Sequence, residues 1–156
     1  MSSSRTGVIV SLNRSNGGVP KLAVAEARVA RDGLEGDRQR NLKHHGGPDR
    51  ALCLYSADLI ESLRLEGHAV EPGALGENVT IGGLDWRLLE PGCQVDVGEI
   101  AIEVTSYAMP CRNIAPAFAD GRSARVSQRT HPGESRVYAR VLREGVVRVG
   151  DPVVVR

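Results

Sequence analysis

Aromatic side chains are scarce in this sequence: one Trp, three Tyr and one Phe make up only 3% of its 156 residues. Aliphatic side chains must therefore build the hydrophobic core, and there is no aromatic platform on which single-stranded bases could stack. The charge does not favour nucleic acid either, because the formal net charge is only +1 and the pI is about 7.8. We expect no nucleic-acid partner.

Long apolar runs are missing as well. No segment approaches the ~20 consecutive apolar residues that cross a bilayer. The first six residues, Met1 to Thr6, lack the apolar region of a secretory signal. We therefore expect a soluble, cytoplasmic protein with no membrane partner.

The sequence contains few cysteines, and their spacing does not indicate pairs. The three residues, Cys53, Cys93 and Cys111, are widely spaced and contain no C-x-x-C pair. This spacing excludes a disulfide framework, a zinc ribbon and a thioredoxin-like motif. In a reducing compartment each cysteine is expected to be a free thiol.

Glycine and proline, by contrast, are plentiful: 18 Gly and 8 Pro divide the chain into short stretches of alternating hydrophobicity, which is typical of β-structure. The length suits one domain over residues 1–156, with the first six residues disordered. Many short strands favour a closed or nearly closed barrel, so the predicted fold is mainly β. The expected strands are Val8–Leu12, Val24–Val29, Leu52–Tyr55, Val79–Ile81, Trp86–Leu89, Gln94–Val97, Ile100–Ser106, Val137–Leu142, Val146–Val149 and Val153–Val155.

One or two short helices accompany these strands. Ser56 can cap a helix in which apolar residues share a face, and Gly67 is a natural stop at its C-terminal end. A second helical turn is expected near residues 115–119. Glu144 and Gly145 predict a late hairpin.

Cys111 is the strongest candidate for chemistry. It lies in the stretch Met109 to Asn113, which follows a predicted strand and enters the second helical turn. The neighbouring Arg112 and the backbone N–H groups of a helix start both favour a thiolate, the form that acts as a nucleophile and as a metal ligand. An inert, partly buried cysteine is the alternative. Cys53, in an apolar strand, is expected to be a small core residue.

A second candidate segment contains His45, Asp49 and Arg50, around two glycines. Such a segment can bring backbone amides and a cation close to an anion, or it can be a plain connecting turn. Asn78 is placed at the mouth of a strand, although Asn is also common in turns.

The C-terminal third is basic, with eight Arg against three acidic residues between positions 112 and 148, a local balance of +5. Arginine can grip phosphate with two parallel hydrogen bonds. Arg112 and Arg140 are therefore candidates for an anion pocket, while most of these arginines are expected on a solvated surface.

Five motifs in a consistent order resemble the MOSC domain, the module at the C-terminus of molybdenum-cofactor sulfurases that also occurs as free-standing bacterial proteins. The resemblance runs from Gly33 to Asp151. The matching stretches are Gly33–Asp37 (GLEGD), His45–Arg50 (HGGPDR) leading to Tyr55, Gly76–Thr80 (GENVT), Gly98–Thr105 (GEIAIEVT) leading to Pro110 and Cys111, and Ala139–Leu142 (ARVL) with Gly145, Gly150 and Asp151.

The resemblance implies a MOSC-type, β-barrel-like fold around a cofactor cleft. It implies that Cys111 is the family's characteristic cysteine, which carries sulfur or ligates the molybdenum of a molybdopterin-type cofactor. The chain departs from the family at Ser106–Met109, where relatives often carry a Gln-Pro-Arg-like stretch. The family is also associated with pyridoxal phosphate, which we attribute to the separate aminotransferase-like domain of the sulfurases.

Three functions follow from the resemblance. The first is a molybdenum-dependent oxidoreductase that reduces N-hydroxylated small molecules, with Cys111 as the metal ligand and electrons from separate redox partner proteins. The predicted cofactor-binding residues are His45, Asp49, Arg50, Asn78, Arg112 and Arg140. The second is a sulfur carrier with a persulfide on Cys111, and the third is a non-catalytic carrier of the cofactor.

Overall fold

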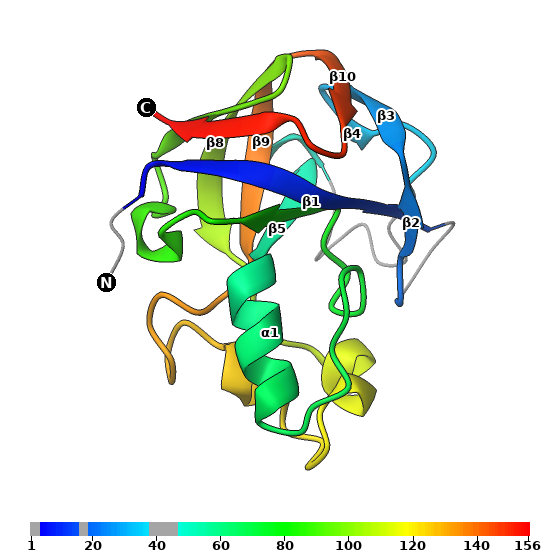
Figure 1. The fold of residues 1–156 in the computed structure, drawn as a ribbon, viewed down its shortest axis with the longest axis vertical. Coiled ribbons are helices and arrows are strands. Elements are labelled where there is room, and N and C mark those ends of the chain that lie inside the picture. Colours follow the sequence, from blue (N-terminus) through cyan, green and yellow to red (C-terminus); the bar gives the residue numbers. More distant parts are fainter. Residues whose placement is uncertain (1–3, 16–18, 38–46) are drawn as a thin grey trace.

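The computed structural model describes residues 4–15, 19–37 and 47–156, and β-strands dominate this part of the chain (Figure 1). The strands are β1 (Thr6–Arg14), β2 (Leu22–Val24), β3 (Glu26–Ala30), β4 (Gly33–Leu34), β5 (Leu52–Ser56), β6 (Val79–Gly82), β7 (Gln94–Val97), β8 (Ile100–Tyr107), β9 (Val137–Arg143), β10 (Gly145–Arg148) and β11 (Pro152–Val155). The helices are α1 (Ala57–Leu65) and the 3₁₀ helices η1 (Pro48–Arg50), η2 (Trp86–Leu88), η3 (Arg112–Ala117) and η4 (Ser123–Val126).

The main sheet closes on itself. Its order is β11-β7-β8-β9-β5-β6-β1-β2, and a further pairing of β11 with β1 closes the strands other than β2 into a barrel. All of these pairs are antiparallel except β5 with β6, which α1 connects as a crossover. The prediction of a mainly β, barrel-like fold is therefore confirmed. Because β11 pairs with β1, these strands do not expose a row of unpaired backbone N–H and C=O groups, as the edge strands of an open sheet do.

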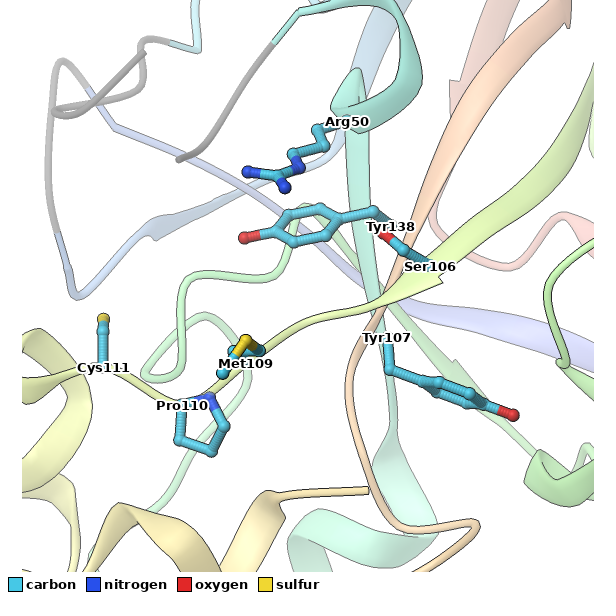
Figure 2. Close-up of a pocket in the computed structure, with 7 residues that line it drawn as sticks. All are labelled: Arg50, Ser106, Tyr107, Met109, Pro110, Cys111 and Tyr138. Carbon is cyan, nitrogen blue, oxygen red and sulfur yellow. The ribbon is translucent and has the colours of Figure 1, made fainter. Parts of the chain in front are cut away.

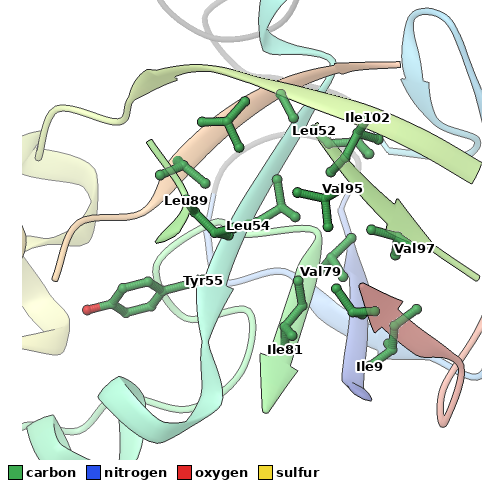
Figure 3. Packing of buried hydrophobic residues seen from close by; sticks show 14 of the residues in the cluster. Ile9, Leu52, Leu54, Tyr55, Val79, Ile81, Leu89, Val95, Val97 and Ile102 are labelled. Atoms are coloured by element: carbon green, nitrogen blue, oxygen red, sulfur yellow. The ribbon is translucent and has the colours of Figure 1, made fainter. Parts of the chain in front are cut away.

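Aliphatic side chains fill the barrel, as the low aromatic content requires. Leu52, Leu54, Val79, Val95 and Ile102 converge on the interior and are almost completely buried (Figure 3). Alternating burial along the strands places one set of side chains inside and the other set outside. β5 and β6 are exceptions, because all of their residues are buried.

The helix α1 begins and ends where the sequence predicts. The hydroxyl of Ser56 accepts a hydrogen bond from the backbone N–H of Leu59 at 3.1 Å, a cap that is typically worth about 1 kcal/mol. Ile60 and Leu63 are buried on the inner face. Gly67, with φ +98°, follows the helix end. The second predicted helical turn is η3, which begins three residues earlier than expected.

Three expectations about strands are wrong. Trp86–Leu88 forms the 3₁₀ helix η2, because Asp85 caps it by accepting from the N–H of Arg87 at 3.2 Å. The segment 24–29 divides into β2 and β3, which belong to different sheets. β10 does not pair with β9 as a hairpin, because it pairs with β3 in the sheet β10-β3-β4.

One end of the barrel carries α1 together with η3, η4 and the segment that returns to β9 (Figure 1).

Residues 4 and 5, for which the sequence predicts disorder, are hydrogen-bonded: Ser4 O accepts from Asp85 N at 2.9 Å, and Arg5 O accepts from Val155 N at 2.8 Å. In the described ranges, no helix has the length and apolar character needed to span a membrane.

Candidate functional site

Cys111 lies between the end of β8 and the start of η3. β8 ends at Tyr107, and three further residues lead to Cys111, which occupies the position immediately before η3 in an extended conformation (φ −129°, ψ 168°). The N–H of Ile114 donates to the carbonyl of Cys111 at 3.2 Å, which closes the first turn of η3. The predicted loop-to-helix setting of this cysteine is thus present, and its side chain is partly exposed.

A cavity of about 320 Å³ opens beside this thiol. Its walls come from three segments that are far apart in sequence: η1, the end of β8 with the loop that follows it, and β9 (Figure 2). The lining residues are Arg50, Ser106, Tyr107, Met109, Pro110, Cys111 and Tyr138. The fold therefore brings together two predicted site residues, Cys111 and Arg50.

The cation of the cavity is stacked on an aromatic ring. The Cζ atom of Arg50 lies 5.4 Å from the ring centroid of Tyr138, a cation–π geometry. Burial raises the pKa of the Tyr138 phenol, the negative charge of a Cys53 thiolate would raise it further, and Arg136 and Arg50 lower it by less. At neutral pH this phenol is therefore protonated and can donate a hydrogen bond.

Asp49 and Arg140 pair with each other outside the cavity lining. An Asp49 oxygen lies 3.8 Å from Nε of Arg140, and the Arg140 guanidinium lies 3.8 Å from a carboxylate oxygen of Glu103. The hydroxyl of Thr105 donates to the carbonyl of Asp49. These contacts join η1 to β8 and β9, so they support the segment that presents Arg50.

Asn78 occupies a different place, inside the barrel wall. It is fully buried: its Oδ1 accepts from Cys53 N at 3.0 Å, and its Nδ2 donates to Asn13 O at 3.3 Å and to Asp37 Oδ2 at 2.9 Å. The side chain thus ties three segments together and is not among the residues that line the cavity.

The remaining predicted site residues are not placed in the cavity. Arg112, the first residue of η3, is exposed and does not line it. His45 lies outside the described residues. Among the described residues, the cation that lines the cavity is therefore Arg50 from η1 rather than Arg112 beside the cysteine.

Tyr138, Ser106 and Arg136 are site or support residues that sequence reasoning missed. Tyr138 lies in β9 and has the spacing of an ordinary core residue, and Ser106 falls within the stretch noted only as a departure from the family. Arg136 is one of many arginines in the basic third, and nothing local distinguishes it. Its 3% exposure becomes apparent only in the folded chain.

The other two cysteines lie outside the cavity lining, and all three are free thiols, as predicted. Cys53 is buried in β5, and burial raises its pKa to about 11. Cys93 is half-buried, and partial burial raises its pKa as well. Among the described residues, no cluster of three or more His, Cys, Asp or Glu could hold a metal ion.

The sequence matches the model of the MOSC domain over residues 41–154. The chain belongs to the MOSC domain family. The matched span overlaps most of the motifs that carry the resemblance, including the strand and loop that lead to Cys111.

Individual MOSC proteins are similar along much of the chain. It is 32% identical to the uncharacterized protein YflK of Bacillus subtilis over 82% of its length, and 33% identical to the protein YiiM of Escherichia coli over 63%. These matches cover 58% of YflK and 46% of YiiM, so the chain spans about half the length of these relatives. The crystal structure of YiiM from Geobacillus stearothermophilus superposes with a TM-score of 0.72 at 26% identity, covering 96% of this chain and 75% of that one.

Proposed function

We propose that this MOSC domain binds a molybdopterin-type molybdenum cofactor, with the Cys111 thiolate as a metal ligand, and that it reduces N-hydroxylated small molecules. The observation that carries the proposal is the shared cavity of Cys111 and Arg50, which places a soft ligand and a cation in one space. Family membership supports the choice of cofactor, because the MOSC domain is associated with molybdenum cofactor.

The residues of the cavity fit such a group. Thiolate is a soft ligand that suits a sulfur-bound metal. A metal that already carries ligands from an organic cofactor needs only a single ligand from the protein. A volume of about 320 Å³ lies at the lower end of the range of roughly 300–1,000 Å³ typical of ligand pockets.

The electrostatics fit an anionic cofactor as well. Arg50 can hold a phosphate group, while the hydroxyls of Ser106 and the protonated Tyr138 can donate hydrogen bonds. None of the described residues that line the cavity is acidic, so the lining itself does not repel an anion. Arg112 and His45 remain predicted cofactor-binding residues, and Asp49, Arg140 and Asn78 would act from outside the lining.

Each residue has a distinct task in the proposed reaction. Cys111 fixes the metal, Arg50 orients the cofactor through its charge, and Tyr138 holds a proton beside the cavity. The bound cofactor supplies the two-electron redox chemistry. In the net reaction R–NHOH takes up two electrons and two protons to give R–NH₂ and water, and the electrons come from separate redox partner proteins. We also propose that the protein is cytoplasmic, a compartment in which thiols such as Cys111 stay reduced.

Turnover of an N-hydroxylated compound tests this function. The protein is purified from a host that makes molybdenum cofactor and is assayed with a chemical electron donor, beside Cys111→Ser and the control Cys93→Ser. We expect turnover in the wild-type protein and in Cys93→Ser, and none in Cys111→Ser. Full activity of Cys111→Ser would overturn the proposal.

Two other outcomes would redirect it. Bound molybdenum without turnover would identify a cofactor carrier. A sulfane sulfur trapped on Cys111 in a protein without molybdenum would identify a sulfur carrier.

A further inference from the structure

A buried arginine, Arg136, grips the loop that carries Cys111. It lies immediately before β9, and only 3% of its surface is exposed. One terminal nitrogen donates to the carbonyl of Leu75 at 2.8 Å, and the other donates to the carbonyl of Met109 at 3.3 Å. The guanidinium therefore bridges two loops that are more than thirty residues apart in sequence.

The backbone around this arginine holds the same loop. The N–H of Ala108 donates to the carbonyl of Arg136 at 2.9 Å. The hydroxyl of Ser135 lies 2.7 Å from the same carbonyl and 3.3 Å from the carbonyl of Ala108. Arg136 therefore holds residue 108 through its backbone and residue 109 through its guanidinium. Residues 108 and 109 lead directly to Pro110 and Cys111.

The other end of the bridge is a firm anchor. Leu75 is fully buried, and its loop is closed by a hydrogen bond from Gly73 N to Oε2 of Glu77 at 3.0 Å. Gly73 has φ +88°, a conformation that favours glycine. Because this loop is fixed against the barrel, its carbonyl can hold the guanidinium in place.

Stability alone does not explain why an arginine is buried at position 136. Its Nε atom is buried and has no hydrogen-bond partner among the described residues. Buried cations carry a large desolvation cost, and a packed apolar side chain is often no less stabilising. The contacts to two carbonyls give this arginine a role that an apolar side chain cannot fill.

We propose that Arg136 is a positioning residue for Cys111: by holding the Met109 carbonyl, it sets the place of the thiol in the cavity. Only Pro110 separates Met109 from Cys111, and the proline ring restricts φ to about −65°. The Met109 carbonyl belongs to the peptide plane that leads into Pro110, so its position constrains the path of the backbone that reaches Cys111. The consequence for metal binding rests on the proposed function, whereas the consequence for the loop does not.

The test compares Arg136→Lys with the control Arg125→Lys. Arg125 is also a largely buried arginine with one unpartnered nitrogen, but it contacts Glu66 at 2.7 Å and Glu134 at 3.1 Å, away from the Cys111 loop. Lysine keeps the charge but cannot hold two carbonyls with a fork. Two quantities are measured: hydrogen exchange of the amides of residues 108, 109 and 111–114, and the alkylation rate of Cys111.

We expect Arg136→Lys to raise both quantities several-fold, at a melting temperature similar to that of Arg125→Lys, which should leave both near wild-type values. A folded Arg136→Lys protein with unchanged exchange and alkylation would overturn the proposal. Both readouts need no cofactor. If Arg136→Lys loosens the loop but the wild-type protein never binds molybdenum, the positioning role of Arg136 stands and the proposed function fails.

A measurement on the wild-type chain covers the case in which Arg136→Lys does not fold. Because different carbonyls hold its two terminal nitrogens, the Arg136 guanidinium should rotate slowly about the Nε–Cζ bond. The rate of this rotation can be measured by ¹⁵N NMR. Rotation as fast as that of an exposed arginine such as Arg112 would contradict the proposal.

Discussion

The guanidinium of Arg50 lies over the ring of Tyr138, with Cζ 5.4 Å from the ring centroid. The two residues come from η1 and β9, and both line the cavity beside Cys111. The contact holds the Arg50 guanidinium against the ring of Tyr138 in the wall of the cavity that Cys111 also lines. The position of the cavity cation therefore depends on an aromatic residue that is 88 positions away in the sequence.

The first prediction concerns this contact. In a double-mutant cycle of Arg50→Met and Tyr138→Leu, the free energies of unfolding should show a coupling of about 0.5–2 kcal/mol, the range for cation–π pairs. Urea unfolding of the four proteins measures it. Additive effects of the two substitutions would show that the contact does not contribute to stability.

The second prediction concerns selective labelling of the cysteines. Because burial raises the pKa of Cys53 to about 11 and excludes reagent, alkylation of the native protein near pH 8 should modify Cys111 and leave Cys53 intact. Peptide mass spectrometry after a time course with iodoacetamide measures this order. Modification of Cys53 at the rate of Cys111 would show that its strand opens easily.

The same burial predicts that Cys53→Ser lowers stability. Cys53 packs against Ala108 and Tyr138, and the substitution places a hydroxyl in this apolar cluster, which should lower the free energy of unfolding by about 1–3 kcal/mol. An unchanged melting temperature would contradict the assignment of Cys53 to the core.

The third prediction concerns Glu77, a fully buried carboxyl. Burial raises its pKa, and hydrogen bonds from Gly73 N and the Thr80 hydroxyl offset this only in part. The folded protein therefore holds this proton more tightly than the unfolded chain. Its contribution to stability is full below the unfolded pKa and falls as pH rises toward the folded value.

Glu77→Gln removes this titration. The free energy of unfolding of Glu77→Gln, minus that of the wild-type protein, should increase from pH 4 toward neutral pH. Urea unfolding of both proteins at several pH values gives this difference. A difference that decreases over the same interval would mean that the pKa of Glu77 is lowered in the folded state.

The fourth prediction concerns a buried ion pair. Nζ of Lys21 lies 2.6 Å from Oδ1 of Asp37, and both side chains are almost fully buried. Lys21→Met leaves the carboxylate unpaired, which should cost about 3–5 kcal/mol. The double variant Lys21→Met/Asp37→Leu should lose less than the sum of the two single losses. Strict additivity in urea unfolding would exclude coupling between the two charges.

Most strands of the barrel could be predicted from the sequence because the signals for a strand are local. Alternating apolar residues marked most of the barrel strands, and Ser56 with Gly67 marked both ends of α1. The wrong prediction of a strand at Trp86–Leu89, where the structure has η2, has a local cause as well. Trp86 and Leu89 are both buried and lie three positions apart, a helical rather than an alternating spacing.

The site was only partly accessible to sequence reasoning. Cys111 could be singled out by its loop and its neighbours, but Tyr138 and Arg136 act through contacts with distant segments. The sequence places Asn78 at the mouth of a strand, where Asn is also common in turns, and its three hydrogen bonds to Cys53, Asn13 and Asp37 can be known only from the fold. Local patterns do not encode which charged residue is buried.

The molybdenum content of the purified protein tests the central claim most directly. The wild-type protein and Cys111→Ser are purified from a host that makes molybdenum cofactor, with Cys93→Ser as the matched control, and metal is measured per chain. We predict near-stoichiometric molybdenum in the wild-type protein and in Cys93→Ser, and its loss in Cys111→Ser. Equal molybdenum in all three proteins, or none in any of them, would contradict a cofactor held by the Cys111 thiolate.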